Sequence, residues 1–174
     1  MCSQPFTSNT RPSTRVHVLI DGANLRGQLP ALGARSLDPH RLRRWAGGYG
    51  RPDIKWFQGN YEWARGFLNQ VRMSGARVIA PAPKPLPGGA LKCDLDVALA
   101  VEAMKHVDRY ATVILGSGDG DFEPLLQELS LRGVRIVVLS GRRCLAPELL
   151  QHVEPEDFVD LASVIDDLSY GAAA

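Results

Sequence analysis

The sequence predicts one α/β domain in which helices cover both faces of a mostly parallel sheet. Three observations support this fold class. The length of 174 residues suits a single domain with one core. Five short apolar runs alternate with helix-like patterns, and we find no internal repeat. Alternating strands and helices join parallel strands by right-handed crossovers, so we expect a three-layer α/β/α, Rossmann-like architecture.

The expected strands are short, mostly apolar and rich in β-branched or aromatic residues, as strands buried on both faces are. They comprise residues 16–20, 54–57, 77–80, 112–115 and 135–139. The expected helices show apolar residues at helical spacing. They comprise residues 38–46, 62–73, 94–107 and 121–131, with one or two short helices after Leu145. Asp38 and Pro39 form a cap followed by proline at the first helical position, and Gly133 ends the fourth helix.

The domain is expected to span residues 15–168, between a flexible tail at 1–14 and a short tail at 169–174. The first segment is rich in Ser, Thr, Pro and Asn and has no apolar targeting core. Three cysteines at no ligand spacing indicate neither a disulfide framework nor a zinc site. With no apolar run of membrane length, we expect a cytoplasmic protein that does not contact a membrane. The sequence does not set the oligomeric state, and a homodimer is compatible with it.

Residues 81–89 are too rich in proline for a helix or an inner strand, so we expect a loop there. The simpler interpretation is a stiff connector. The alternative is a flap over a functional site, because the loop leads directly into the acidic segment 92–96.

Two acidic motifs each follow an apolar strand. In the first, Asp21 comes directly after the strand and Asn24 lies three residues later; in the second, residues 116–122 read Gly-Ser-Gly-Asp-Gly-Asp-Phe and include Ser117, Asp119 and Asp121. Ligands of open parallel sheets bind beyond the carboxyl ends of the strands, where the winding reverses. Both motifs would meet at that edge if their strands are neighbours.

A third acidic motif, Lys92 to Val97, opens a helix and contributes Asp96. Several carboxylates packed together repel one another unless a proton or a cation neutralises them. An all-oxygen ligand set selects Mg²⁺ or Mn²⁺, and either ion suits phosphodiester hydrolysis by an activated water. The sequence therefore predicts a divalent-metal site.

Each acidic residue also has a structural interpretation. Asp21 and Asp121 are residue types that often form turns or cap helices, and Asp94 could cap its helix, which makes Asp96 the better ligand of that pair. Glu102 lies six residues after Asp96, about 120° around a helix, so we expect a supporting role or an exposed pair with His106. The glycines at 116–120 do not match a dinucleotide loop, because Asp121 stands where the third glycine is needed.

As a set, these motifs resemble the NYN domain, the LabA-like branch of the PIN-like metal-dependent ribonucleases. The matching segments are residues 20–24, 92–102 and 115–125, within a similarity that runs from about residue 15 to 140. The resemblance implies adjacent first and fourth strands, a Mg²⁺ or Mn²⁺ site and RNA as substrate. By position it implies metal ligands at Asp21, Asp96, Asp119 and Asp121. Asn24 and Ser117 would orient them or contact phosphate, and Lys92 would balance charge. Glu102 replaces the commoner aspartate of the family.

A basic and aromatic stretch lies between residues 41 and 65. It holds six basic residues against two acidic ones, and aromatic side chains among cations are typical of single-stranded nucleic-acid binding. The aromatic members are Trp45, Tyr49, Trp56, Phe57, Tyr61 and Trp63. Trp56 and Phe57 fit a buried strand, so the predicted RNA contacts are Arg41, Arg44, Tyr49 and Arg51.

The sequence thus predicts a divalent-metal-dependent ribonuclease acting on single-stranded or loop RNA. One alternative is a regulatory module that binds nucleic acid or protein with little turnover. A metal-dependent phosphatase or nucleotidase is the other, and the residues after Asp119 lack the nucleophile motif of such enzymes.

Overall fold

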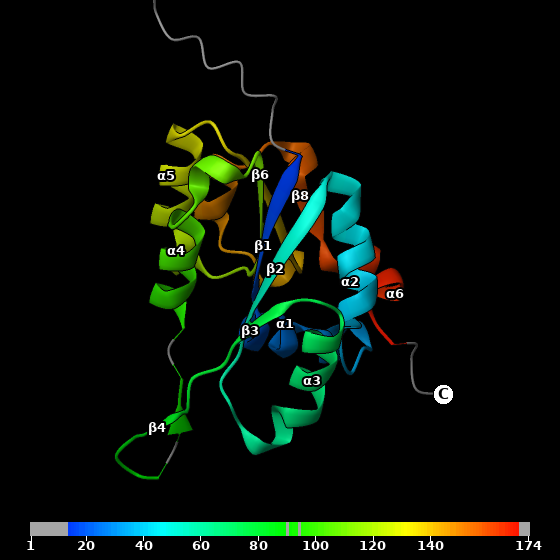
Figure 1. The fold of residues 1–174 in the computed structure, drawn as a ribbon, viewed down its shortest axis with the longest axis vertical. Helices are drawn as coiled ribbons and strands as arrows, with labels where there is room; N and C mark the ends of the chain where they lie inside the picture. Colours follow the sequence, from blue (N-terminus) through cyan, green and yellow to red (C-terminus); the bar gives the residue numbers. More distant parts are fainter. Residues whose placement is uncertain (1–13, 90, 94, 171–174) are drawn as a thin grey trace, which may run out of the picture.

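The protein forms a six-stranded parallel sheet in the order β3-β2-β1-β6-β7-β8. The computed structural model describes residues 14–89, 91–93 and 95–170, with the backbone alone at 91 and 92. Figure 1 shows the sheet between two layers of helices. The strands are β1 (Arg15–Asp21), β2 (Arg51–Phe57), β3 (Arg77–Ile79), β6 (Thr112–Gly116), β7 (Arg135–Ser140) and β8 (Phe158–Asp160). The predicted fold class and all five predicted strands are confirmed, and the first and fourth of them, β1 and β6, are neighbours.

Helices cover both faces of the sheet (Figure 1). They are α1 (Gly22–Gln28), α2 (Pro39–Ala46), α3 (Arg65–Met73), α4 (Asp96–Met104), α5 (Glu123–Leu131) and α6 (Leu161–Leu168). Helices α2, α3 and α6 pack on one face, and α4 and α5 on the other. Short 3-10 segments precede α3 (Glu62–Ala64) and α5 (Gly120–Phe122).

The ends of two helices follow the rules for capping. The carboxylate of Asp38 accepts hydrogen bonds from the backbone N–H groups of His40 and Arg41 and so begins α2, with Pro39 in the first turn. Gly133, just beyond α5, has a φ of 69°, a left-handed conformation that glycine adopts without steric cost.

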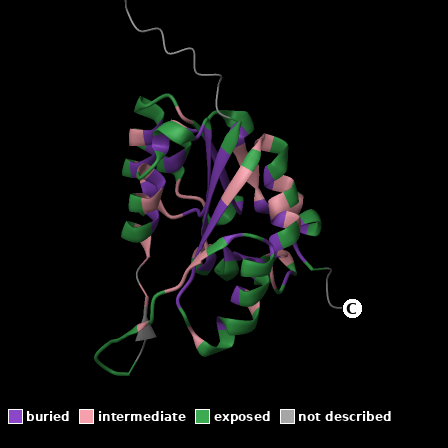
Figure 2. Ribbon diagram, viewed as in Figure 1, coloured by how far each residue is buried: buried purple, intermediate pink, exposed green. Residues whose placement is uncertain are grey.

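Side chains alternate across β1 and divide the core in two. Val18 and Ile20 face the layer of α2, α3 and α6, whereas Leu19 faces α4 and α5. Figure 2 shows the central strands largely buried and the outer faces of the helices exposed. By the same alternation Asp21, at the end of β1, falls on the side of α4.

The structure differs from the sequence-based prediction in three places. The proline-rich segment contains β4 (Lys84–Pro85), which pairs antiparallel with β5 (Leu91–Lys92) and projects from the body of the domain (Figure 1). Two-residue strands are too short for a periodic pattern to reveal. Helix α1 was not predicted, because it is brief and follows Asp21, a residue type that often forms turns. Strand β8 was not predicted, because it has only three residues.

The first residue of the expected C-terminal tail, Ser169, packs against the domain. Ser169 is buried and forms a bridge with Leu37. Thr14 and Tyr170 also belong to the expected tails: the Thr14 carbonyl accepts from the Arg51 N–H at 2.7 Å, and the Tyr170 hydroxyl donates to Gln70 at 3.3 Å. The remaining tail residues, 1–13 and 171–174, lie outside the described part of the chain. No helix among the described residues has both the length and the apolar character needed to cross a membrane.

Candidate functional site

The two acidic motifs meet where the winding of the sheet reverses. β1 connects toward β2 and β3 on one side, while β6, β7 and β8 lie on the other. Ile20 of β1 pairs with Gly116 of β6, so Asp21 and Ser117, the next residue in each chain segment, lie side by side at the carboxyl edge. Crevices for ligands form at this position in open α/β sheets.

Hydrogen bonds fix the carboxylate of Asp21 in this crevice. Its Oδ1 accepts from the backbone N–H of Asn24 at 3.0 Å, and its Oδ2 accepts from Ser117 Oγ at 3.2 Å. Ser117 Oγ in turn accepts from the backbone N–H of Asp119 at 3.3 Å. Ser117 is fully buried, so its hydroxyl is placed to orient Asp21 and Asp119 rather than to contact a phosphate.

Asn24 braces the crevice from within α1. Its Oδ1 accepts from the backbone N–H of Gly118 at 3.1 Å and from Gln28 Nε2 at 2.7 Å. The other end of the Gln28 amide accepts from the backbone N–H of Gly141, beyond β7, at 2.7 Å. Gly118 has no room for a side chain, because a Cβ there would meet the carbonyl oxygen of Cys144. These hydrogen bonds connect the segments that follow β1, β6 and β7 and fix their positions relative to Asp21.

Three of the four predicted metal ligands line one cavity of about 220 Å³. Asp21, Asp96 and Asp119 reach it from β1, the first turn of α4 and the loop after β6. Asp121 is not among the lining residues. It is exposed, and its backbone N–H donates to Asp119 Oδ1 at 3.1 Å, so Asp119, not Asp121, caps the 3-10 turn that leads into α5.

The setting of Asp21 disfavours its charged form. Burial raises the pKa of this carboxyl above its ordinary value, and the charge of Asp119 acts in the same direction. The hydrogen bonds from Asn24 and Ser117 oppose the shift without cancelling it. A buried carboxylate that lies near a second carboxylate is destabilised in its charged form, and a bound cation would remove this destabilisation.

The donor atoms in the cavity fit a hard divalent cation. The three aspartates supply only oxygen ligands, the type that Mg²⁺ and Mn²⁺ prefer. Within the described ranges, no three acidic, histidine or cysteine side chains already stand close enough together to hold an ion. Asp94, whose role was left open, lies outside those ranges.

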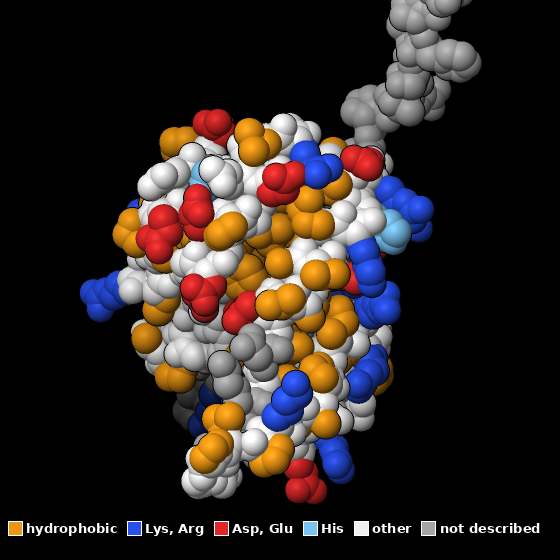
Figure 3. Space-filling model, turned by 90° about the vertical axis from the view of Figure 1, so that its left-hand side faces the viewer, with side chains coloured by type: hydrophobic (Ala, Val, Ile, Leu, Met, Phe, Trp, Pro, Cys, Tyr) orange, Lys and Arg blue, Asp and Glu red, His pale blue; other side chains and the backbone are white. Residues whose placement is uncertain are grey.

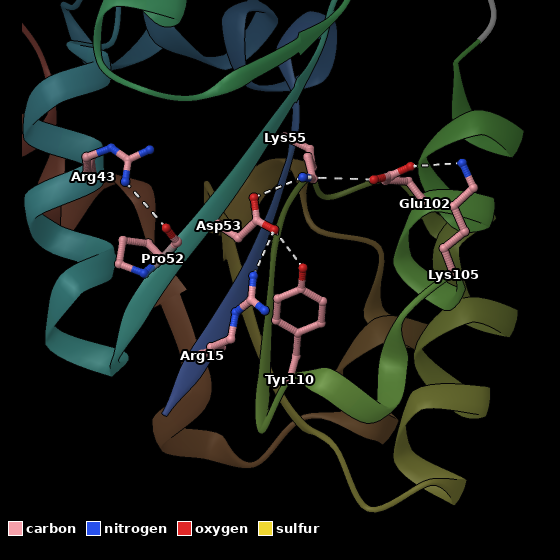
Figure 4. A network of polar contacts seen from close by, with 8 residues as sticks. All are labelled: Arg15, Arg43, Pro52, Asp53, Lys55, Glu102, Lys105 and Tyr110. Atoms are coloured by element: carbon pink, nitrogen blue, oxygen red, sulfur yellow. Dashed lines mark hydrogen bonds and ion pairs between the residues drawn. The ribbon is translucent and has the colours of Figure 1, made fainter. Parts of the chain in front are cut away.

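Glu102 pairs with lysines and not with His106, which corrects the expected pair. Its carboxylate lies 4.0 Å from Lys55 Nζ and 3.5 Å from Lys105 Nζ. Figure 4 shows Lys55 between Glu102 and Asp53, with Asp53 also accepting a hydrogen bond from Tyr110. Glu102 thus ties α4 to β2, away from the lining of the aspartate cavity.

The predicted RNA contacts are not gathered around the aspartates. Arg51 begins β2, whose seven residues at roughly 3.3 Å each place it about 20 Å from the carboxyl edge. Tyr49 lies beside that start. Arg41 pairs with Asp38 at 3.5 Å and donates to the Asp166 carbonyl, while Arg44 is exposed on α2. The side chain of Lys92 is not described. An RNA-binding role for these residues stays a prediction.

Acidic and basic side chains are unevenly distributed on the side of the molecule that α4 and α5 cover. In Figure 3 most acidic side chains lie in the upper and left-hand parts of this view, and most Lys and Arg side chains lie along its right-hand edge and in its lower part.

Sequence reasoning missed two residues, one that lines the aspartate cavity and one that lines an adjoining hollow. Arg26 of α1 places its guanidinium 3.7 Å from the centre of the Trp63 ring, and Trp63 stacks on Tyr61. Gln58 follows β2 directly and lines the aspartate cavity. A glutamine after a strand carries no recognisable pattern, but the pair of aromatic residues at 61 and 63 was a usable signal.

A sequence profile of the NYN domain matches residues 15–162. The chain belongs to the NYN domain family. A curated relative of this NYN domain is the low amplitude and bright protein LabA of Synechococcus elongatus, 27% identical over 170 residues that cover 90% of this chain and 89% of LabA. A crystal structure of a protein of unknown function from Vibrio parahaemolyticus superposes with a TM-score of 0.76 at 23% identity, covering 93% of this chain and 99% of that one. That likeness supports the fold alone.

Proposed function

We propose that this NYN domain is a divalent-metal-dependent ribonuclease that hydrolyses phosphodiester bonds of single-stranded or loop RNA in the cytoplasm. One observation carries the proposal. Asp21, Asp96 and Asp119 come from three separate segments of the chain and line one cavity at the switch point of the sheet. Family membership independently favours nuclease chemistry.

In this proposal the three aspartates hold Mg²⁺ or Mn²⁺. A bound divalent ion would supply an activated water and neutralise charge on the phosphate. Ser117 and Asn24 keep the Asp21 carboxylate turned into the cavity through the hydrogen bonds described above. Asp121, exposed at the rim, holds Asp119 through its backbone N–H and is available to an incoming strand or to water.

The test is cleavage of a labelled single-stranded RNA by Asp21→Asn and Asp119→Asn variants at fixed Mn²⁺. Each substitution removes a charged oxygen ligand and should reduce the rate by at least a hundredfold. Asp167→Asn, at an exposed position on α6, is the matched control and should cleave like the parent. A parent-like rate for Asp21→Asn would refute the proposal.

The same assay separates the alternatives. RNA binding without cleavage under any divalent ion would indicate a regulatory module. Release of phosphate from nucleotides without RNA cleavage would indicate a phosphatase. Matching reactions with DNA measure whether the strand must carry 2′-hydroxyl groups.

A further inference from the structure

Gln58 lines three adjoining hollows, of which the aspartate cavity is one. The second is an open hollow next to Arg26, Tyr61 and Trp63. The third is a more enclosed cavity of about 190 Å³ behind Trp63. We propose that this third cavity is a subsite for a single nucleobase, belonging to a nucleotide next to the phosphodiester in the aspartate cavity. The inference rests on the proposed ribonuclease function.

The interior of the enclosed cavity has the character of a base-binding pocket. Leu25, Leu29, Trp56 and Phe67 form much of its wall. Specific small-ligand pockets are mostly apolar and carry a few polar groups that fix orientation. A flat heteroaromatic ring with polar edges matches such a lining.

Two polar groups at this cavity lack partners. Gln58 is only 4% exposed and lines all three hollows, and none of the hydrogen bonds between described residues involves its side-chain amide. The indole N–H of Trp56 is also buried, and no acceptor for it lies among the described residues. Leaving buried polar groups unpaired costs free energy, so such groups usually have a function or a bound partner. The polar edge of a base would supply the missing hydrogen bonds.

The Gln58 amide and the Trp56 indole N–H lie close to Gly22, the residue that follows Asp21 at the end of β1. A Cβ on Gly22, the residue after Asp21, would approach both Trp56 Nε1 at 2.5 Å and Gln58 Oε1 at 2.6 Å. Glycine at this position therefore leaves space between the end of β1 and the Gln58 amide. Because Gln58 lines both this cavity and the aspartate cavity, a base bound at Gln58 would belong to a nucleotide next to the aspartates.

Aromatic and cationic side chains stand at the mouth of the cavity. Trp63 is 56% exposed, an unusual position for its large ring. Arg26 covers one part of the indole at 3.7 Å, and Tyr61 stacks on Trp63 with ring centres 5.4 Å apart and planes 10° from parallel. Aromatic rings and arginine planes are the groups on which unstacked RNA bases are held.

The first test measures affinity for a labelled single-stranded RNA octamer in EDTA, where no cleavage occurs. Trp63→Ala should raise Kd by about five- to hundredfold, the range for losing one stacked base. The control is Tyr170→Ala, which removes another exposed aromatic ring that lines none of the three hollows. Equal affinity of parent and Trp63→Ala would overturn the subsite.

Gln58→Met tests the interior without disturbing the fold. Methionine has a similar length, and the amide that it replaces has no described partner, so the melting temperature should stay the same or rise. RNA affinity should nevertheless fall by about three- to tenfold, the worth of one hydrogen bond. A lower melting temperature with unchanged affinity would show that Gln58 serves only the fold.

A third measurement identifies the chemical group that binds. The protein has three tryptophans, whose indole N–H signals can be followed by NMR. AMP should shift the signals of Trp56 and Trp63 and leave that of Trp45, while ribose 5-phosphate should shift none. Equal shifts with ribose 5-phosphate would replace the base subsite with a phosphate site.

These results are independent of cleavage. If Asp21→Asn abolishes cleavage and Trp63→Ala binds RNA normally, the subsite is wrong and the ribonuclease proposal stands. If the octamer and AMP bind as expected and no RNA is cleaved under any divalent ion, the base subsite stands and the ribonuclease proposal is wrong.

Discussion

Asn24 Oδ1 accepts a hydrogen bond from the backbone N–H of Gly118 at 3.1 Å, which joins the first acidic motif to the second. The two residues are 94 positions apart in the sequence. The same oxygen accepts from Gln28 Nε2, so both of its lone pairs are used within the protein. Asn24 therefore acts by positioning the segments that carry Asp21 and Asp119.

Replacing Asn24 with alanine should lower both stability and cleavage. The substitution leaves the N–H of Gly118 without an acceptor, at a cost of about 1–3 kcal/mol if this group remains buried. The Gln28 amide loses one of its two acceptors and keeps Ser140 Oγ at 3.2 Å. Asn24→Asp keeps the acceptor oxygen and should retain more stability, although it adds a charge near Asp21. Urea unfolding in EDTA compares the two variants. Equal stability of Asn24→Ala and the parent would show that the bridge to Gly118 contributes nothing.

Millimolar Mg²⁺ or Mn²⁺ should raise the melting temperature, and EDTA should reverse the rise. An ion that binds only the folded state stabilises it by mass action and neutralises the buried Asp21 and its neighbour Asp119. Asp21→Asn should be more stable than the parent in EDTA and should lose most of the metal-dependent shift. Calorimetry with and without metal gives both quantities. A full shift in Asp21→Asn would exclude this residue as a ligand.

Glu102→Gln should reduce stability modestly and leave cleavage close to that of the parent. Its carboxylate is largely buried beside Lys55, and removing the charge costs about 1 kcal/mol or more when one partner of such a pair remains. Lys55 keeps Asp53 at 2.9 Å, which limits the loss. Denaturant unfolding and an RNA cleavage assay are measured on the same preparation. Loss of cleavage with normal stability would place Glu102 in the catalytic set.

The sequence predicted the sheet well because parallel strands leave a strong local signal. β1 and β6 are mostly apolar, as strands buried on both faces are. β8 has three residues and β4 has two, so neither contains enough residues to show a period. Helix α1 follows Asp21 without a loop, and its glycine start resembled a turn.

The sequence could predict those parts of the candidate site whose positions follow from the order of the strands in the sheet. Asp21 and Asp119 each follow a strand, and neighbouring parallel strands must bring them to one edge. The side chain of Gln58 depends on packing between β2, α1 and the segment before α3, which no local pattern encodes. Arg51 and Tyr49 lie far from the aspartates because β2 runs parallel to β1 and begins at the opposite edge of the sheet. Their nearness to Trp63 in the sequence therefore does not bring them near the site.

Combined replacement of Arg41, Arg44 and Arg51 with glutamine should affect long RNA more than short RNA. Arg51 lies about 20 Å from the carboxyl edge of the sheet that carries the aspartates, so a trinucleotide bound at that edge should keep its affinity. A longer strand that reaches these cations should bind more weakly, with a flatter slope of log affinity against log salt, because fewer counterions are released. An unchanged slope for the long RNA would show that these arginines face away from it.

His17 should make the protein less stable as the pH falls from 6.5 to about 4. Burial lowers the pKa of this histidine from 6.5 to about 4, and its ring stacks on Tyr110 with neither nitrogen hydrogen-bonded to a described residue. Asp53 and Glu102 favour protonation, while Lys55 and His106 oppose it. In this window the unfolded chain binds a proton that the folded protein refuses, so stability falls by up to about 1.4 kcal/mol per pH unit.

His17→Phe keeps the stacking partner of Tyr110 and removes the titrating group. Its unfolding free energy should therefore vary less than that of the parent between pH 6.5 and 4, and the two proteins should differ most near pH 4. Below that pH both states of the parent carry the proton, so the difference should stop growing. His40→Gln, at an exposed position on α2, is the control and should follow the parent. Urea titrations at four pH values measure the slopes, and parallel curves for the parent and His17→Phe would show that another group sets the acid sensitivity.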